Sequence, residues 1–115
     1  MTPATAQAMY RRQFDAHGRR ITIERRVVNA DPISIPNVRV RIRGLTPEEV
    51  AGGIDVNQRK AIVLAEDVPD TFAPLKKGDY LVVDGIKMMV VDRPDDQTRC
   101  VGETLIAYEC TLSGS

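Results

Sequence analysis

With 115 residues, the chain has room for one small domain and not for two independent cores. Five aromatic residues and no Trp leave a core made mainly of Val, Ile and Leu, which favours strands. The net charge is zero, whereas a dedicated nucleic-acid-binding domain usually carries a clear basic excess.

The charge is nevertheless divided along the chain. Residues 1–60 contain 11 Lys and Arg against 6 Asp and Glu, and residues 61–115 contain 5 against 10. This division fits a basic surface that meets an acidic surface of another copy or of a neighbouring protein. Neutralisation within the folded monomer is the alternative.

Other sequence-wide features bear on location. No apolar run approaches the ~20 residues that a membrane-spanning helix needs. The N-terminal stretch MTPATAQAMYRR has no basic segment followed by an apolar one, so secretion is not expected. Cys100 and Cys110 lack the spacing of a metal site or a thioredoxin-type motif. We therefore expect two reduced thiols in a cytosolic product.

Residues 4–17 predict a helix. Thr2-Pro3 is a plausible start and Gly18 a plausible stop. An apolar stripe at helical spacing predicts a docking face, and its members are Ala6, Met9, Tyr10 and Phe14. His17, the only histidine, stands at the helix end, where a capping role is a better interpretation than catalysis.

From Arg19 the apolar period changes to two and predicts a strand over about 20–28, which the segment NADPISIP interrupts. The next predicted strand, about 37–43, alternates aliphatic residues with Arg39, Arg41 and Arg43. Because side chains alternate across a strand, its aliphatic face should point into the core and its arginines outward. Acidic residues of a neighbouring strand, a neighbouring subunit and DNA are all candidate partners for this row.

A long excursion, Gly44–Gln58, follows that strand. Within it, TPEE has the form of a capping box for one helical turn, which Gly52-Gly53 would stop. We expect a projecting loop, whose candidate interface residues are Leu45, Thr46, Pro47, Glu48, Glu49, Gly52 and Gly53.

The second half of the chain predicts further strands. A third strand is expected over Arg59–Glu66, followed by a loop over Asp67–Lys77. Asp79–Val83 and Ile86–Asp92 flank Asp84-Gly85, a pair that favours a type I′ hairpin turn. One long final strand is expected over Val101–Leu112. With no βαβ alternation, the fold class is mainly β: a single domain containing a small antiparallel barrel or sandwich of about six strands and one N-terminal helix.

Catalytic patterns are weak. His17 has no apparent acidic partner, and the carboxylate pairs Glu48-Glu49 and Asp95-Asp96 both fall in turns. Gly52-Gly53 is not followed by the Lys and Ser or Thr of a phosphate-binding loop, and metal-ligand clusters are absent from the sequence. We therefore expect no enzymatic activity, no cofactor and no metal.

A small nucleic-acid-binding barrel remains an alternative because Arg suits phosphate. Against it, the aromatic residues do not interleave with Arg39, Arg41 and Arg43 as a single-strand stacking platform requires. The acidic balance of residues 61–115 favours a protein partner for the row over DNA.

The order of features resembles the small head–tail joining proteins of tailed bacteriophages, also called head-closure, stopper or neck proteins, with relatives in prophages and gene transfer agents. The segments that carry the resemblance are RRQFDAHGRRITIERR, VRVRIRG, LTPEEVAGGIDVNQRKAIVLAEDV and LKKGDYLVVDGIKMMVVDRP. It covers about Tyr10 to Leu112, and its most telling parts are Pro47–Val63 and Gly78–Val91.

The resemblance implies a structural virion protein of the head–tail junction, assembled in the host cytoplasm. Copies would form a ring, commonly hexameric, beneath the portal and its adaptor, close the DNA-filled head and provide the surface on which the tail docks. Packaged DNA would be contacted non-specifically, and by position Gly44–Gln58 would project toward the central channel. A tail-terminator or tail-completion protein is the alternative within the same class.

Overall fold

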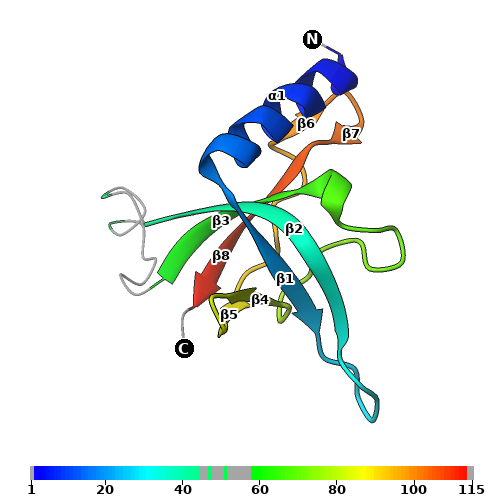
Figure 1. Cartoon of the computed structure of the whole chain (residues 1–115), viewed down its shortest axis with the longest axis vertical. Coiled ribbons are helices and arrows are strands. Elements are labelled where there is room, and N and C mark those ends of the chain that lie inside the picture. The colour runs from blue at the N-terminus through cyan, green and yellow to red at the C-terminus, as the bar shows by residue number, and fades with distance from the viewer. Residues whose placement is uncertain (1, 45–46, 48–50, 52–57, 114–115) are drawn as a thin grey trace.

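The computed structural model describes residues 2–44, 47, 51 and 58–113, and the account below covers these residues (Figure 1). They form the following elements in chain order: helix α1 (Pro3–His17), β1 (Arg19–Arg25), β2 (Ile33–Arg43), β3 (Gln58–Leu64), the 3-10 turn η1 (Ala65–Asp67), β4 (Tyr80–Val83), β5 (Ile86–Val90), β6 (Cys100–Val101), β7 (Thr104–Leu105) and β8 (Ala107–Ser113).

Six of these strands close into an antiparallel barrel in the order β1-β2-β3-β8-β5-β4, which confirms the predicted fold class. Many of the side chains that point into the barrel are fully buried, among them Ile23, Val40, Val63, Leu81 and Leu112. The loop between η1 and β4 contributes Val68, Phe72 and Leu75 to the same apolar cluster. A small barrel of this kind is filled by its own side chains.

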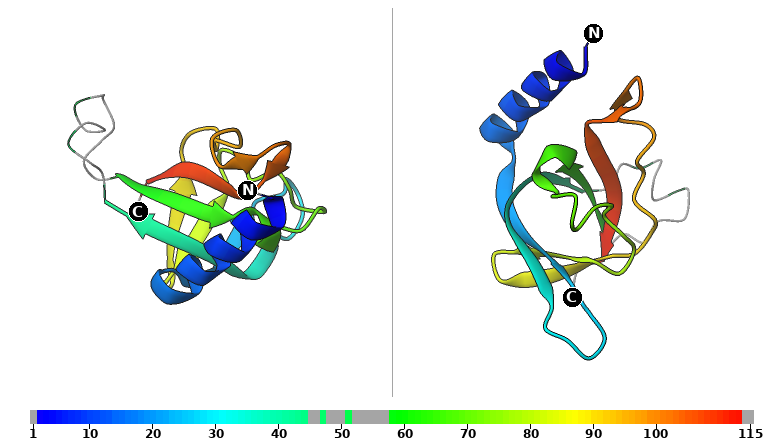
Figure 2. Two further views of the ribbon diagram at one scale, coloured as in Figure 1. Left: turned by 90° about the horizontal axis from the view of Figure 1, so that it is seen from above. Right: turned by 90° about the vertical axis from the view of Figure 1, so that its right-hand side faces the viewer.

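Helix α1 lies on the outside of the barrel, where it contacts β2 and β6 (Figure 2). The Thr2 side chain accepts a hydrogen bond from the Thr5 backbone N–H, and the Gly18 N–H donates to the carbonyl of Phe14, so the predicted start and stop are confirmed. Ala6 and Phe14 of the predicted stripe are buried, whereas Met9 is 42% exposed. The face of α1 that packs on the barrel is therefore narrower than the predicted apolar stripe, because it does not bury Met9.

Strand β2 begins at Ile33, four residues before the predicted start, because a β-bulge accommodates the proline. Ile21 pairs with Val38 and Ile23 with Ile35, so two residues of β2, Pro36 and Asn37, stand opposite Thr22 alone. Asn37 has a φ of 59°, a conformation that Asn adopts more readily than most residues. A bulge is one of the few places in a sheet that tolerates proline.

The early start of β2 makes the β1–β2 hairpin longer than predicted, and its end extends beyond the barrel (Figures 1 and 2). Val28 at this end is 88% exposed, Ile33 is 44% exposed and Val27 is 38% exposed. We call Val27–Ile33 the apolar arm.

The β4–β5 hairpin follows its prediction closely. Asp84 and Gly85 both have positive φ, 51° and 81°, as a type I′ turn requires, and Val83 pairs with Ile86. The long final strand predicted over Val101–Leu112 is wrong, because the chain first forms the separate β6–β7 hairpin and only then enters the barrel as β8. The predicted third strand is also too long, since β3 ends at Leu64 and η1 follows.

One buried ion pair fixes the loop before β4 to the end of β1. The Arg25 guanidinium donates to both oxygens of Asp79 at 2.9 and 2.8 Å, and to the carbonyls of Phe72 and Pro74 at 2.8 Å. Its Cζ lies 3.9 Å from the centroid of the Phe72 ring. Because Asp79 is only 2% exposed, loss of Arg25 would leave a buried carboxylate without its main hydrogen-bond donor.

Candidate interface on the outer face of β2 and β3

The alternation of strand β2 is realised as predicted. Val38 and Val40 are fully buried inside the barrel, and Ile42 packs partly buried against the same core. The three arginines therefore lie on the outer face, but their surroundings differ.

Arg39 is bound within its own chain. Its side chain is 14% exposed, and it donates to both oxygens of Asp67 at 2.8 and 2.9 Å and to Glu66 at 3.0 Å. Asp15 of α1 lies 3.5 Å from the same guanidinium. With three carboxylates around it, the Arg39 side chain serves to stabilise the folded monomer. Its position does not support the expected contact with a neighbouring subunit or with DNA.

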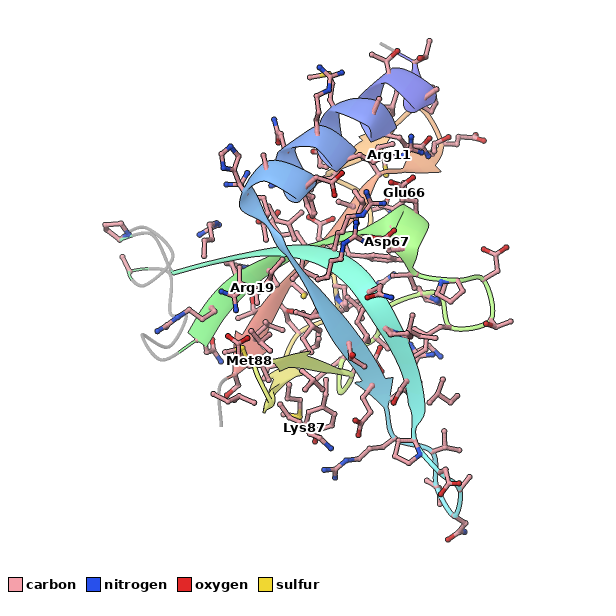
Figure 3. All side chains as sticks on the ribbon, in the orientation of Figure 1. Arg11, Arg19, Glu66, Asp67, Lys87 and Met88 are labelled. Atoms are coloured by element: carbon pink, nitrogen blue, oxygen red, sulfur yellow. The ribbon has the colours of Figure 1, made fainter. Side chains whose placement is uncertain are left out.

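The same network ties α1 to the barrel. Arg11 of the helix donates three hydrogen bonds to Glu66, at 2.7, 2.9 and 2.7 Å, and Figure 3 shows Arg11, Glu66 and Asp67 grouped between α1 and η1. Burial by itself would raise the pKa of Asp67. Hydrogen bonds from the side chain and backbone of Arg39, together with the guanidinium charge, outweigh burial and hold that pKa below its ordinary value.

Arg41 and Arg43 have different surroundings. Arg41 is exposed and forms no ion pair with the described residues. Arg43 has a side chain that is 41% exposed and lies 3.8 Å from Glu109, a distance at which the pairing is loose. Lys60 on β3 pairs in register with Arg43, so the two cations share the outer face.

Around these cations the surface is hollowed. A depression of about 220 Å³ is lined by His17, Arg41, Ile42, Arg43 and Ile62. We call Arg41, Arg43 and Lys60 the cationic face. It lies where β2 ends and β3 begins, so the segment 44–58 leaves and rejoins the barrel beside it.

The candidate residues of that segment lie almost entirely outside the described residues. This holds for Leu45, Thr46, Glu48, Glu49, Gly52 and Gly53. Pro47 is described and exposed. Their role at an interface stays a prediction.

The division of charge along the chain is largely used inside the monomer. Five of the ten acidic residues in 61–115 form ion pairs with residues of the first half: Glu66, Asp67, Asp79, Asp84 and Glu109. An acidic partner on a second copy was the reason to favour protein over DNA for the arginine row. The preference for a protein partner is therefore weaker, because half of these acidic groups already form ion pairs within the monomer.

Among the described catalytic candidates, Asp95 has a structural role in its turn. Asp95 accepts hydrogen bonds from the backbone of Gln97 and Thr98 and from the Thr98 hydroxyl, which lowers its pKa. Cys100 and Cys110 form no disulfide, and the Cys100 thiol donates to the Asp96 carbonyl at 3.2 Å. Burial raises the pKa of Cys110 to about 12. No group of three or more His, Cys, Asp or Glu in the described ranges could hold a metal ion.

No helix of the described chain is both long enough and apolar enough to cross a membrane. Scans against protein-family models, curated proteins and solved structures each found no match to this chain.

Proposed function

We propose that this chain is a structural protein of a phage-type head–tail junction. It assembles as a ring beneath the portal and adaptor, helps to close the DNA-filled head and offers the tail its docking surface. Its role is mechanical and needs no cofactor.

The observation that carries the proposal is the architecture. The resemblance implies a small barrel with one N-terminal helix and a long excursion between two early strands. The chain folds as a closed six-stranded barrel with α1 on its outside, and 14 residues separate Arg43 of β2 from Gln58 of β3. This agreement supports the proposal as an analogy of fold, because it concerns the topology of the whole barrel.

The apolar arm supports assembly in particular. Val28 is 88% exposed at the end of a hairpin that extends beyond the barrel (Figure 1). Exposed apolar groups gathered at one projecting element are typical of surfaces that associate. A ring formed by head-to-tail contacts would bury such an element against the next copy.

Co-sedimentation tests this function. Purified full-length protein is mixed with portal–adaptor complexes and, separately, with tail tubes from the phage, prophage or transfer-agent system in which the chain is encoded. We expect the folded protein to sediment with the portal–adaptor complex. Sedimentation with tail tubes alone would favour the tail-terminator alternative, and sedimentation with neither would overturn the proposal.

A further inference from the structure

The tip of the apolar arm is folded into a turn. The Ala30 N–H donates to the carbonyl of Val27 at 3.3 Å, and Asn29 has a φ of 61°. Val28 lies within this turn and is the most exposed large apolar residue among those described, and Asp31 follows it as an exposed carboxylate. An apolar element that already has a defined shape loses less conformational entropy on docking than an unstructured one.

Helix α1 carries a surface of matching character. A depression of about 180 Å³ on it is lined by Met9, Arg12 and Gln13. Met9 and Arg12 are three positions apart, so they are neighbours on the helix surface with about 5–6 Å between their Cβ atoms. Met9 is exposed, and the depression beside it has room for the branched end of a valine side chain.

The charges at the two surfaces are complementary. Arg12 and Asp31 are both exposed, and neither forms an ion pair within the part of the chain that the structure describes. Each surface therefore combines an apolar group with one charge, and the two charges are opposite. An apolar centre with a charged rim is the usual composition of a protein–protein contact, and the rim charges fix its register.

The two surfaces cannot meet within one chain. The tip of the arm and α1 lie at opposite ends of the molecule (Figures 1 and 2). The complementary surface that the arm matches is thus available only on another copy. Because every copy carries one arm and one α1, such contacts are head-to-tail and can continue from copy to copy.

We propose that the apolar arm of one copy docks on α1 of a second copy, with Val28 in the depression beside Met9 and Asp31 paired with Arg12. The inference deepens the proposed function and rests on its assembly of copies. The residues of the contact follow from the shape and charge of the arm and the helix.

Disulfide crosslinking between copies tests the inference without any portal. The variant Met9→Cys/Val28→Cys is made in a Cys100→Ser background, because Cys100 is partly exposed. It is oxidised at about 1 mM protein, where a contact with a Kd near 1 mM is substantially occupied. The matched control is Ala4→Cys/Val28→Cys, since Ala4 is exposed on another side of the same helix. Circular dichroism establishes that both variants are folded.

We expect Met9→Cys/Val28→Cys to form covalent trimers and longer species at least about tenfold faster than the control, because a specific contact raises the effective concentration of the two thiols. Val28→Cys alone should stop at dimers. Trimers that form no faster in Met9→Cys/Val28→Cys than in the control would overturn the inference.

A charge exchange in the same cysteine variant tests the register of the contact. Asp31→Arg places two cations together and should slow crosslinking at least about twofold. Adding Arg12→Asp restores opposite charges and should restore the rate. A rate that stays low after the exchange would overturn the inference.

These experiments separate the inference from the function on which it rests. Sedimentation of the parent chain with portal–adaptor complexes, without specific crosslinking, would reject the inference and keep the function. Specific crosslinking without sedimentation would reject the function and keep the contact between copies.

Discussion

Arg39 and Arg41 occupy equivalent positions two residues apart on the outer face of β2, and their neighbours give them different roles. η1 and α1 approach the strand at Arg39 and supply three carboxylates within 3.5 Å. None of the described acidic groups forms an ion pair with Arg41. Arg39 stabilises the fold, and Arg41 stays exposed.

Replacing Arg39 should destabilise the monomer. Arg39→Ala leaves Asp67, which is 15% exposed, without its main partner, so we expect the free energy of unfolding to fall by about 2–4 kcal/mol. Urea denaturation measures this loss. Arg41→Ala on the same strand is the control and should change the free energy by less than about 0.5 kcal/mol. Equal losses in both variants would contradict the division of roles.

Asp67 should make stability depend on pH in the acid range. Its pKa in the folded protein is lowered, so the unfolded chain takes up the proton first as pH falls. The stabilisation is complete above the unfolded pKa of about 3.9 and is lost as pH falls through the folded pKa. Asp67→Asn should therefore be less stable than the parent at neutral pH, and urea midpoints should converge below about pH 4. A gap of constant size down to acid pH would contradict this.

The junction between α1 and β1 has no room for a side chain at Gly18. A Cβ at Gly18 would lie 2.6 Å from the Val40 carbonyl oxygen and 2.8 Å from that of Phe14, and both are backbone atoms. Gly18→Ala should therefore displace the helix from the barrel and cost about 1–3 kcal/mol in urea denaturation.

Gly44 is the matched control for this junction, because a Cβ there has no atom within 4 Å. Gly44→Ala should change the free energy of unfolding by less than about 0.5 kcal/mol. A Gly18→Ala protein as stable as Gly44→Ala would show that α1 can shift without loss.

Local chemistry made several elements predictable. The Asp84-Gly85 turn depends on these two adjacent residues alone. The end of the helix at Gly18 depends on a hydrogen bond to Phe14, only four residues earlier in the sequence. The start of β2 was missed because Pro36 normally ends a strand, and only pairing with β1 reveals the bulge. The break before β8 was missed for a similar reason, since β6 and β7 pair with each other and not with the barrel.

The roles of the charged residues were harder to predict. Arg39 and Asp67 are 28 positions apart, and Arg25 and Asp79 are 54 apart, so their pairing follows from tertiary structure alone. The alternation of β2 correctly places its arginines outside the barrel. It contains no information on which of them η1 and α1 cover.

For the whole molecule, the apolar arm is the projecting apolar surface that folding of the described residues leaves exposed. Val28→Asp should leave the urea midpoint unchanged because the side chain is 88% exposed in the monomer. It should weaken assembly on portal–adaptor complexes at least tenfold, since a buried carboxylate without a partner is costly. Thr71→Asp adds the same charge at another exposed position and should assemble normally. Normal assembly of Val28→Asp would exclude the arm from the interface.

The central claim is that copies of this chain form a ring at a head–tail junction. Electron cryo-microscopy of portal–adaptor complexes incubated with the full chain tests it most directly. The account predicts an added ring of barrels on the side of the adaptor away from the head, with the β2–β3 end of each barrel directed toward the channel. A complex that shows the portal and adaptor alone, with the folded chain remaining free in solution, would contradict the account.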